Sequence, residues 1–359
     1  MKTKTTRLNC LLGLSLLAAA CGAQAQSTVT LYGILDAGVR YGSGLDAANA
    51  ASALSTTAIS SGINTTSRFG MRGVEDLGGG LKATFNLEGG INVDTGASVS
   101  ATKLFDRAAT VGLQGDWGTL TAGRQNTVLA DAVGAVDPMG VRYSGFNPNV
   151  SIAALSAHRL GLEYGAAGST TGTYRLDNSL KYVARFGDFS VRAMHAFGEQ
   201  AGNTSNLSSS GLGAGYQAGA YTAALSYAQF KTVTGLNLKG YLGGVSAMLG
   251  QNKLALTYGD HEAETTVIAK TRNKTLGFGG TFPITENVDF VAAYYRVTRT
   301  RTASLDDGFS RLMGFVEYKF SKRTRAYLEL DNTRWKDGYQ AVGTKSTANG
   351  VSLGVVHNF

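Results

Sequence analysis

Apolar and polar residues alternate along most of this chain with a period of two, the repeat of a β-strand rather than of an α-helix. Segment 81–88 shows it most clearly, because four apolar residues on one face oppose Lys, Thr, Asn and Glu on the other. Only 127–136 or 151–160 would suit a helix. The chain is therefore predicted to be all-β. The same alternation returns in four later segments: 220–230, 310–320, 324–333 and 350–359.

Sixteen segments are predicted to be strands, most of them close to the 9–11 residues that a tilted strand needs to cross a bilayer. They are 28–40, 66–76, 81–92, 104–114, 118–125, 174–186, 189–197, 211–217, 220–231, 238–250, 253–261, 272–282, 288–299, 310–320, 324–333 and 350–359.

The connections between these strands are of two kinds. Very short links, such as 187–188, 218–219, 251–252 and 321–322, alternate with long polar segments. Short turns at one end and long loops at the other describe an up-and-down meander. The long segments are 42–65, 94–102, 199–210, 262–272, 300–310 and 334–348.

Such strands suit either a soluble sandwich with an apolar core or a membrane barrel with an apolar exterior and a wet lumen. The barrel is favoured because an even number of strands closes the sheet, because aromatic residues gather near strand ends, and because large aliphatic residues are few. Phe69 and Met71 are then expected to face lipid. Arg68, Arg72 and Glu88 are expected to face the lumen, where their charges stay hydrated.

The first 25 residues read as a signal peptide. A basic start and an apolar run end at Ala23-Gln24-Ala25, a signal-peptidase pattern. A lipoprotein acylated at Cys21 is the weaker alternative. The expected domains are thus a signal peptide, 1–25, and a barrel, 26–359. Both cysteines lie in the signal, which excludes disulfides from the mature chain. The signal also carries three positive charges, so its removal lowers the net charge from +8 to about +5.

No chemistry beyond the barrel is predicted. The histidines have no metal-ligand spacing, no nucleophile stands in a catalytic pattern, and no basic cluster suggests nucleic acid. The glycine-rich segment 211–219 lacks the residues of a phosphate loop. Asp306 and Asp307 read as a solvated loop tip rather than a cation site. We expect no enzyme activity, no metal and no cofactor.

Six blocks follow one another along the chain: 27–39, 67–88, 104–125, 174–182, 318–330 and 353–359. Together they resemble the general porins of Gram-negative outer membranes, in particular the trimeric type of β-proteobacteria. The resemblance implies a 16-stranded antiparallel transmembrane β-barrel with an inward-folded third loop, which passes small hydrophilic solutes and ions. It also implies a homotrimer in contact with outer-membrane lipid and lipopolysaccharide, and assembly machinery that recognises the terminal Phe359.

The third long loop, about 126–173, would narrow the pore in such a protein, with Asp131 and Asp137 on it. Its later half is expected to form an extra hairpin or helix rather than part of the constriction. The resemblance places a ladder of wall arginines opposite it. The complete expected constriction is Arg68, Lys82, Arg107, Arg124, Asp131, Asp137 and Arg175.

Strand parity tests this ladder. It supports Arg68 and Arg175, whose neighbours of the same phase are polar. Arg107 shares its phase with Val111, and Arg124 would need a bulge or a strand end to face the lumen. The excess of cations predicts moderate anion preference.

The alternative function is a channel selective for anionic nutrients or sugars. Sugar selectivity would need a run of lumen aromatics, whereas Tyr295 and Tyr327 are isolated. A soluble adhesin or lectin is a third reading. For the barrel, the first and last strands are expected near the threefold contact of a trimer.

Overall fold

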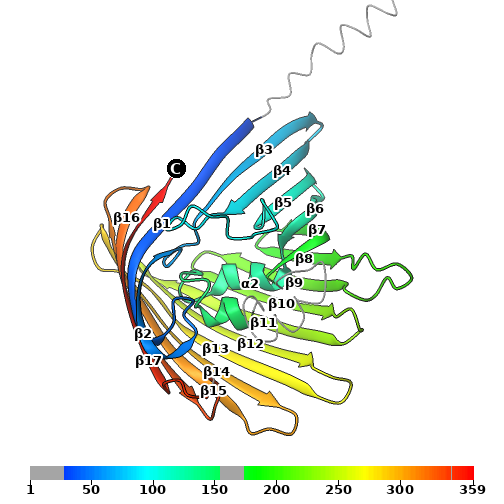
Figure 1. Cartoon of the computed structure of the whole chain (residues 1–359). Coiled ribbons are helices and arrows are strands. Elements are labelled where there is room, and N and C mark those ends of the chain that lie inside the picture. Colours follow the sequence, from blue (N-terminus) through cyan, green and yellow to red (C-terminus); the bar gives the residue numbers. More distant parts are fainter. Residues whose placement is uncertain (1–27, 154–173, 341) are drawn as a thin grey trace, which may run out of the picture.

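The computed structural model describes residues 28–153, 174–340 and 342–359. They form a single closed barrel with a helix inside it (Figure 1). The predicted signal peptide lies outside the described residues, as do Cys21 and residues 154–173 of the third loop.

Sixteen strands form the wall, each antiparallel to its neighbours. The ring closes because β1 pairs with β17 through Ile34–Ser43, and with β3 through Thr28–Ile34. The barrel and its strand order agree with the prediction. The wall strands are β1 (Thr28–Leu45), β3 (Arg68–Gly78), β4 (Leu81–Gly90), β5 (Ala108–Gly115), β6 (Gly118–Asn126), β7 (Arg175–Phe186), β8 (Phe189–Ala196), β9 (Ser209–Ala218), β10 (Tyr221–Lys231), β11 (Asn237–Leu249), β12 (Asn252–Glu264), β13 (Lys270–Pro283), β14 (Val288–Arg301), β15 (Asp307–Lys319), β16 (Thr324–Lys336) and β17 (Thr347–Asn358).

A further strand, β2 (Ala51–Ser61), lies in the first long loop, where no strand was predicted. It pairs with the loop end of β1, with Thr57 opposite Tyr41. β1 has 18 residues, and β3 pairs only with its first part. An uncovered strand edge exposes unpaired backbone groups, and β2 satisfies those of β1 beyond the reach of β3.

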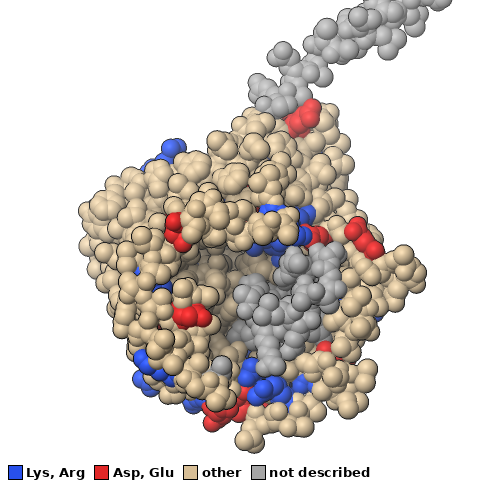
Figure 2. Space-filling view, in the orientation of Figure 1, with Lys and Arg blue, Asp and Glu red and all other residues tan. Residues whose placement is uncertain are grey.

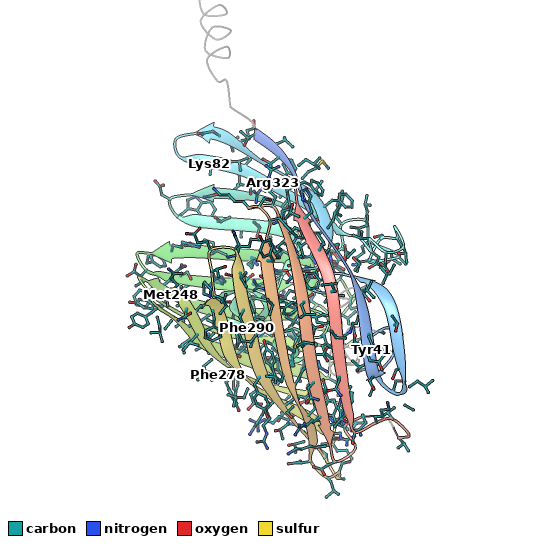
Figure 3. The ribbon with its side chains drawn as sticks, turned by 90° about the vertical axis from the view of Figure 1, so that its left-hand side faces the viewer. Tyr41, Lys82, Met248, Phe278, Phe290 and Arg323 are labelled. Carbon is teal, nitrogen blue, oxygen red and sulfur yellow. The ribbon has the colours of Figure 1, made fainter. Side chains whose placement is uncertain are left out.

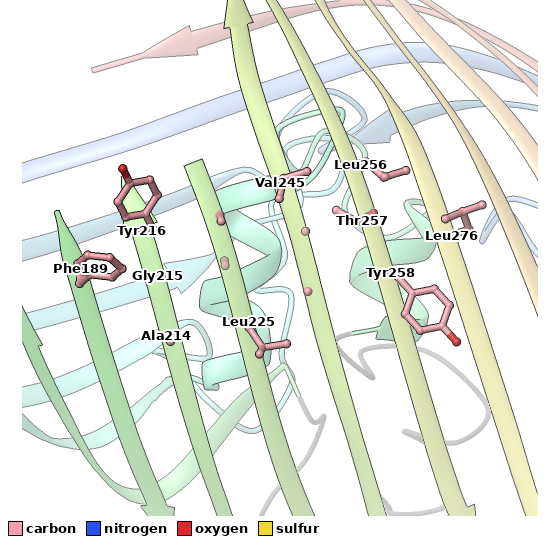
Figure 4. A pocket seen from close by; sticks show the side chains of 14 residues that line it. Phe189, Ala214, Gly215, Tyr216, Leu225, Val245, Leu256, Thr257, Tyr258 and Leu276 are labelled. Carbon is pink, nitrogen blue, oxygen red and sulfur yellow. The ribbon is translucent and has the colours of Figure 1, made fainter. Parts of the chain in front are cut away.

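The outward face of the barrel is apolar, as the alternation predicted. Paired residues share a face, so Leu31 opposite Met71 lies outside, whereas Thr30 opposite Arg72 lies inside. Figure 3 shows Phe278 and Phe290 on this outer wall. A surface depression of about 520 Å³ is also on it, lined by side chains such as Leu225 and Val245 (Figure 4). This depression faces lipid rather than the channel.

One side of the interior is filled by the third loop. Its helix α2 (Val128–Val136) begins at Thr127, whose hydroxyl accepts a hydrogen bond from the Ala130 backbone N–H at 3.1 Å. This confirms the helix expected at 127–136. No helix of the described residues is long and apolar enough to cross a bilayer. A π-helical turn, η1 (Asn149–Ala153), follows on the loop.

Glycines of the wall make room for α2. A Cβ atom at Gly211 would lie 2.6 Å from Val128 Cγ2, and one at Gly244 would lie 2.6 Å from Val136 Cγ2. Valines of the helix therefore pack directly on the backbone of the barrel. This contact explains the glycine-rich segment around 211 that the sequence left without a role.

The lumen is therefore not uniformly wet, which corrects the sequence expectation. Met313 and Phe315 point inward from β15 and are fully buried. They pack in one apolar cluster with Tyr143 and Phe146 of the third loop. The loop covers inward apolar residues that would otherwise face water, so this part of the barrel has a protein core.

Candidate functional site

A group of arginines projects into the lumen from β3 to β7. Arg107 Nε lies 2.6 Å from Glu88 Oε1, and Arg68 Nε lies 3.5 Å from Glu88 Oε2. Arg124 Nη1 lies 2.7 Å from Asp177 Oδ1, and Lys103 also pairs with Asp177. We call these residues, together with Arg175, the constriction cluster. Figure 2 shows Lys and Arg atoms at the edge of the central opening.

The local backbone structure that directs the side chain into the lumen differs among the predicted arginines. Arg68 opens β3 and pairs with Ile34, which places it on the inner face. Arg107 lies just before the first residue of β5, so the alternation of faces along that strand does not fix the direction of its side chain. Its backbone N–H donates a hydrogen bond to the Glu88 carbonyl at 3.1 Å. The parity objection to Arg107 thus disappears at the end of the strand.

Arg124 reaches the lumen side through a bulge, one of the two conditions that the sequence set for it. The register of β6 against β7 shifts between Gly123 and Gln125. Gly123 has φ +115°, and a Cβ atom there would lie 2.1 Å from the Ala109 carbonyl oxygen. Only glycine fits this backbone, which turns Arg124 toward Asp177.

Arg175 lies beside a polar cavity of about 320 Å³ between the wall and the third loop. Arg68 and Arg107 line the same cavity, as does Tyr174, whose ring lies 5.0 Å below the Arg175 guanidinium. Within the described residues Arg175 makes no ion pair, and its Nε is buried without a hydrogen-bond partner. The cluster therefore carries more positive than negative charge.

The two loop carboxylates have different positions. Asp131 Oδ2 lies 2.9 Å from Lys181 Nζ and 3.7 Å from Arg192 Nε, at the lumen side of α2. Asp137 is only 1% exposed. It therefore does not line open channel, which corrects its predicted position.

Asp137 instead organises the turn of the loop. It accepts hydrogen bonds from the backbone N–H of Met139 and Val141 and from Asn147, Asn149 and Tyr295. Burial raises the pKa of Asp137, and these donors stabilise its charged form against that shift. Its role is to hold the loop in shape against β14.

The sequence also predicted the wrong position along the barrel for Lys82. It pairs with Asp76 and Gln114 near the short turns. Figure 3 shows it at the same end of the barrel as Arg323, which lies in another short turn. The alternation along β4 predicted correctly that the Lys82 side chain is on the inner face, but it could not predict how far along the barrel axis this residue lies.

Asp307, read as part of a solvated tip, is in fact 4% exposed. Its two carboxylate oxygens accept hydrogen bonds from Arg299 at 2.7 and 2.6 Å, and Arg301 binds the same group.

Sequence reasoning missed the residues that hold the third loop on the wall. Arg142 makes a bidentate pair with Glu317 of β15, at 2.6 and 2.9 Å. The only signal for it was an inward-phase glutamate on that strand and an arginine on the loop.

A second set, which we call the anchor cluster, binds the tip of the loop. It consists of Arg40, Arg311, Glu329 and Asp331. Arg40 lies 2.9 Å from Glu329 and 2.7 Å from Asp331, and all three side chains are almost fully buried. The Arg311 guanidinium carbon lies 3.4 Å from the centre of the Phe146 ring.

The terminal Phe359 closes the barrel at the short-turn end. Its backbone N–H donates to the Gly33 carbonyl at 3.0 Å, and the Gly33 N–H donates back at 3.1 Å. Its ring packs on Gly33, where any Cβ atom would collide with it.

Known proteins with the same features are porins. The Gram-negative porin family matches residues 13–338. Outer membrane porin protein 32 of Delftia acidovorans is 29% identical over 97% of this chain and 99% of its own length. An outer membrane porin protein of Bordetella pertussis is 39% identical over 42% of this chain and 41% of its own length.

Solved structures agree on the fold. The anion-selective porin from Comamonas acidovorans has a TM-score of 0.74 and 26% identity, covering 93% of this chain and 100% of that one. The trimer form of Vibrio cholerae OmpT has a TM-score of 0.67 at 19% identity, covering 93% and 99%. The structure is a closed barrel with a polar, partly filled lumen, and the family match covers most of the chain. The chain therefore belongs to the Gram-negative porin family and is an outer-membrane channel, not an enzyme.

Proposed function

We propose that this channel is a general diffusion pore with moderate anion preference, and that the constriction cluster sets that preference. The single observation that carries the proposal is the charge of the cluster. Arg68, Arg107, Arg124, Arg175 and Lys103 outnumber their carboxylate partners, Glu88 and Asp177.

Fixed charges act strongly at this place. The screening length at physiological salt is about 8 Å, comparable to the width of a narrow pore, so a passing ion is poorly shielded from the wall. Arg107 and Arg124 are close enough to Arg175 for their like charges to repel. A mobile anion that enters the cavity relieves this repulsion.

The relative with an anion-selective title supports the proposal by analogy, since it shares the barrel and 26% of the sequence. A sugar-selective channel has less support. Among the described residues Tyr295 and Tyr327 are 0% and 1% exposed, because the loop covers them and each donates a hydrogen bond to a buried aspartate. They are not available to a passing sugar.

We also propose a homotrimer, with β1 and β17 near the threefold contact. Their outward residues, such as Val39 and Leu353, are apolar and 53% and 65% exposed in the single chain. The trimer form of the Vibrio cholerae protein supports this by analogy. The apparent mass on a native gel should fall threefold on boiling, and a monomer in mild detergent would contradict the trimer.

The test of selectivity is the double substitution Arg68→Gln and Arg175→Gln. We expect the reversal potential in planar bilayers under a salt gradient to move toward cation preference, most at low salt, with the pore still conducting. Arg72→Gln is the matched control, because Arg72 is an exposed lumen arginine on the same strand. An unchanged reversal potential in the double variant would refute the assignment.

A further inference from the structure

The end of the first long loop lies inside the barrel, against the inner face of β1. Residues 62–67, which we call the bridge, connect β2 to β3. The Asp36 side chain of β1 accepts hydrogen bonds from the backbone N–H groups of Asn64 and Thr65, both at 2.6 Å. The Asp36 backbone N–H donates to the Ser67 hydroxyl at 2.9 Å. Asp36 and Asn64 are both 0% exposed, so these contacts hold the bridge to the wall without competition from water.

Asn64 connects the bridge to three further elements. Its backbone carbonyl accepts a hydrogen bond from the Tyr143 backbone N–H of the third loop at 3.2 Å. Its side-chain amide donates to Glu317 of β15, and its side-chain oxygen accepts a hydrogen bond from Arg325 of β16 at 2.8 Å. A single buried residue thus fixes the position of the third loop relative to β1, β15 and β16.

The third loop needs such support where it meets the bridge. Val141 and Tyr143 have φ +64° and +50°, in the left-handed region that branched and bulky side chains avoid. Such a backbone persists only where the surrounding contacts impose it. One of these contacts is the Asn64 carbonyl, which binds the Tyr143 N–H. Another is Glu317, which binds Arg142 of the turn and the Asn64 amide together. The shape of this turn therefore depends on the bridge as well as on hydrogen bonds within the third loop.

The bridge and the turn of the third loop meet at the edge of the polar cavity in the constriction. Thr66 of the bridge and Val141 and Ser144 of the turn line this cavity, whose volume is about 320 Å³. The hydroxyl oxygens of Thr66 and Ser144 are 2.8 Å apart, and Arg68 donates a hydrogen bond to the Thr66 carbonyl at 3.2 Å. The place where the two loops touch is thus part of the boundary of the pore.

We infer that the bridge positions the third loop and thereby sets the width of the constriction, with Asn64 as the positioning residue. Asn64 is uncharged and fully buried, so it touches no passing solute and acts only through the loop. The inference deepens the proposed function and rests on it, since the constriction cluster is taken to border the narrowest part of the pore. It concerns the size of the solutes that pass, whereas the arginines concern their charge.

The first test is the substitution Asn64→Ala in the full barrel. Single-channel conductance should rise roughly 1.5-fold, because the released turn no longer occupies part of the narrowest cross-section. Liposome swelling with neutral sugars of increasing size should show entry of sugars that the parent excludes. Asn332→Ala is the matched control, because it removes an amide that bonds Asn349 on the wall and should leave both measurements unchanged. Asn64→Ser should act in the same direction, and it decides the question if Asn64→Ala does not fold.

The second test restores the loop position by a cross-link. The substitutions Thr66→Cys and Ser144→Cys replace two hydroxyls that already touch, so the new sulfurs lie close to bonding distance. The chain has no cysteine after Cys21, so no other thiol competes in the mature barrel. In the Asn64→Ala background, oxidation should return the conductance and the sugar limit to the parent values, and reduction should raise them again. Heat-modifiable migration in sodium dodecyl sulfate confirms that each variant is folded.

The outcomes separate this inference from the proposed selectivity. Parent conductance and an unchanged sugar limit in folded Asn64→Ala and Asn64→Ser would overturn the role of the bridge. A widened pore that stays wide after mass spectrometry has confirmed the cross-link would overturn it as well, because the opening would not arise from the loop position. Neutral sugars do not respond to wall charge, so a failure of the arginine substitutions to move the reversal potential would leave the swelling result intact.

Discussion

Two groups of arginines face the interior of this barrel, and their environments are opposite. In the anchor cluster Arg40 is 5% exposed in its side chain and meets two carboxylates that are fully buried. In the constriction cluster Arg68 is 24% exposed and shares Glu88 with Arg107. One arrangement neutralises its cations under a loop, and the other leaves positive charge beside open space.

The difference shows that residue type alone does not assign a role in a pore. A buried charge must be matched by partners, because removing two ions from water is expensive. A hydrated charge needs no such match and can act on passing ions. The anchor cluster is therefore structural, and the constriction cluster is free to act on solutes.

The largest effect should come from breaking the anchor. Arg40→Met leaves Glu329 and Asp331 buried together without their cation, and we expect the folded state to lose about 3–5 kcal/mol of stability. The measurement is the urea midpoint of the refolded protein in detergent. Arg72→Gln removes an exposed lumen arginine and should leave the midpoint unchanged. Equal shifts in both variants would abolish the distinction between the two environments.

A smaller effect is expected where the loop turns. Asp137→Ala leaves buried donors of Asn147, Asn149 and Tyr295 without their acceptor, at a cost of about 1–3 kcal/mol for each such group. Because β14 then loses this contact with the loop, single-channel recordings should show larger and noisier conductance. A quiet pore of unchanged conductance would mean that the Arg142–Glu317 pair holds the loop alone.

The smallest effect is expected from a substitution in the constriction cluster. Glu88→Gln removes a carboxylate that pairs with Arg107 and Arg68, so the cluster becomes more positive. Anion preference should rise modestly, opposite in sign to the arginine substitutions, as measured by reversal potential at low salt. Lys82→Gln is the control near the short turns and should change little. A shift toward cations in Glu88→Gln would contradict a purely electrostatic role.

The sequence by itself determined the barrel. A period-two pattern assigns each residue a face, short and long connections assign each strand its direction, and closure follows because no strand edge can stay unpaired in hydrocarbon. These are local rules, so sixteen strand positions, the α2 segment and the inner phase of Arg68 were all predictable. The need for a bulge or a strand end at Arg124 was also predictable, since parity left no other way inward.

Tertiary structure alone decided what each inward residue meets. Asp137 and Arg68 are both polar groups near the loop, yet one is sealed in a hydrogen-bonded turn and the other borders a cavity. The height of Lys82 and the partners of Arg40 depend on residues about 30 to 290 positions away. Parity repeats along every strand, whereas burial and charge pairing depend on where the folded loop comes to rest across the lumen, and no local pattern in the sequence records that position.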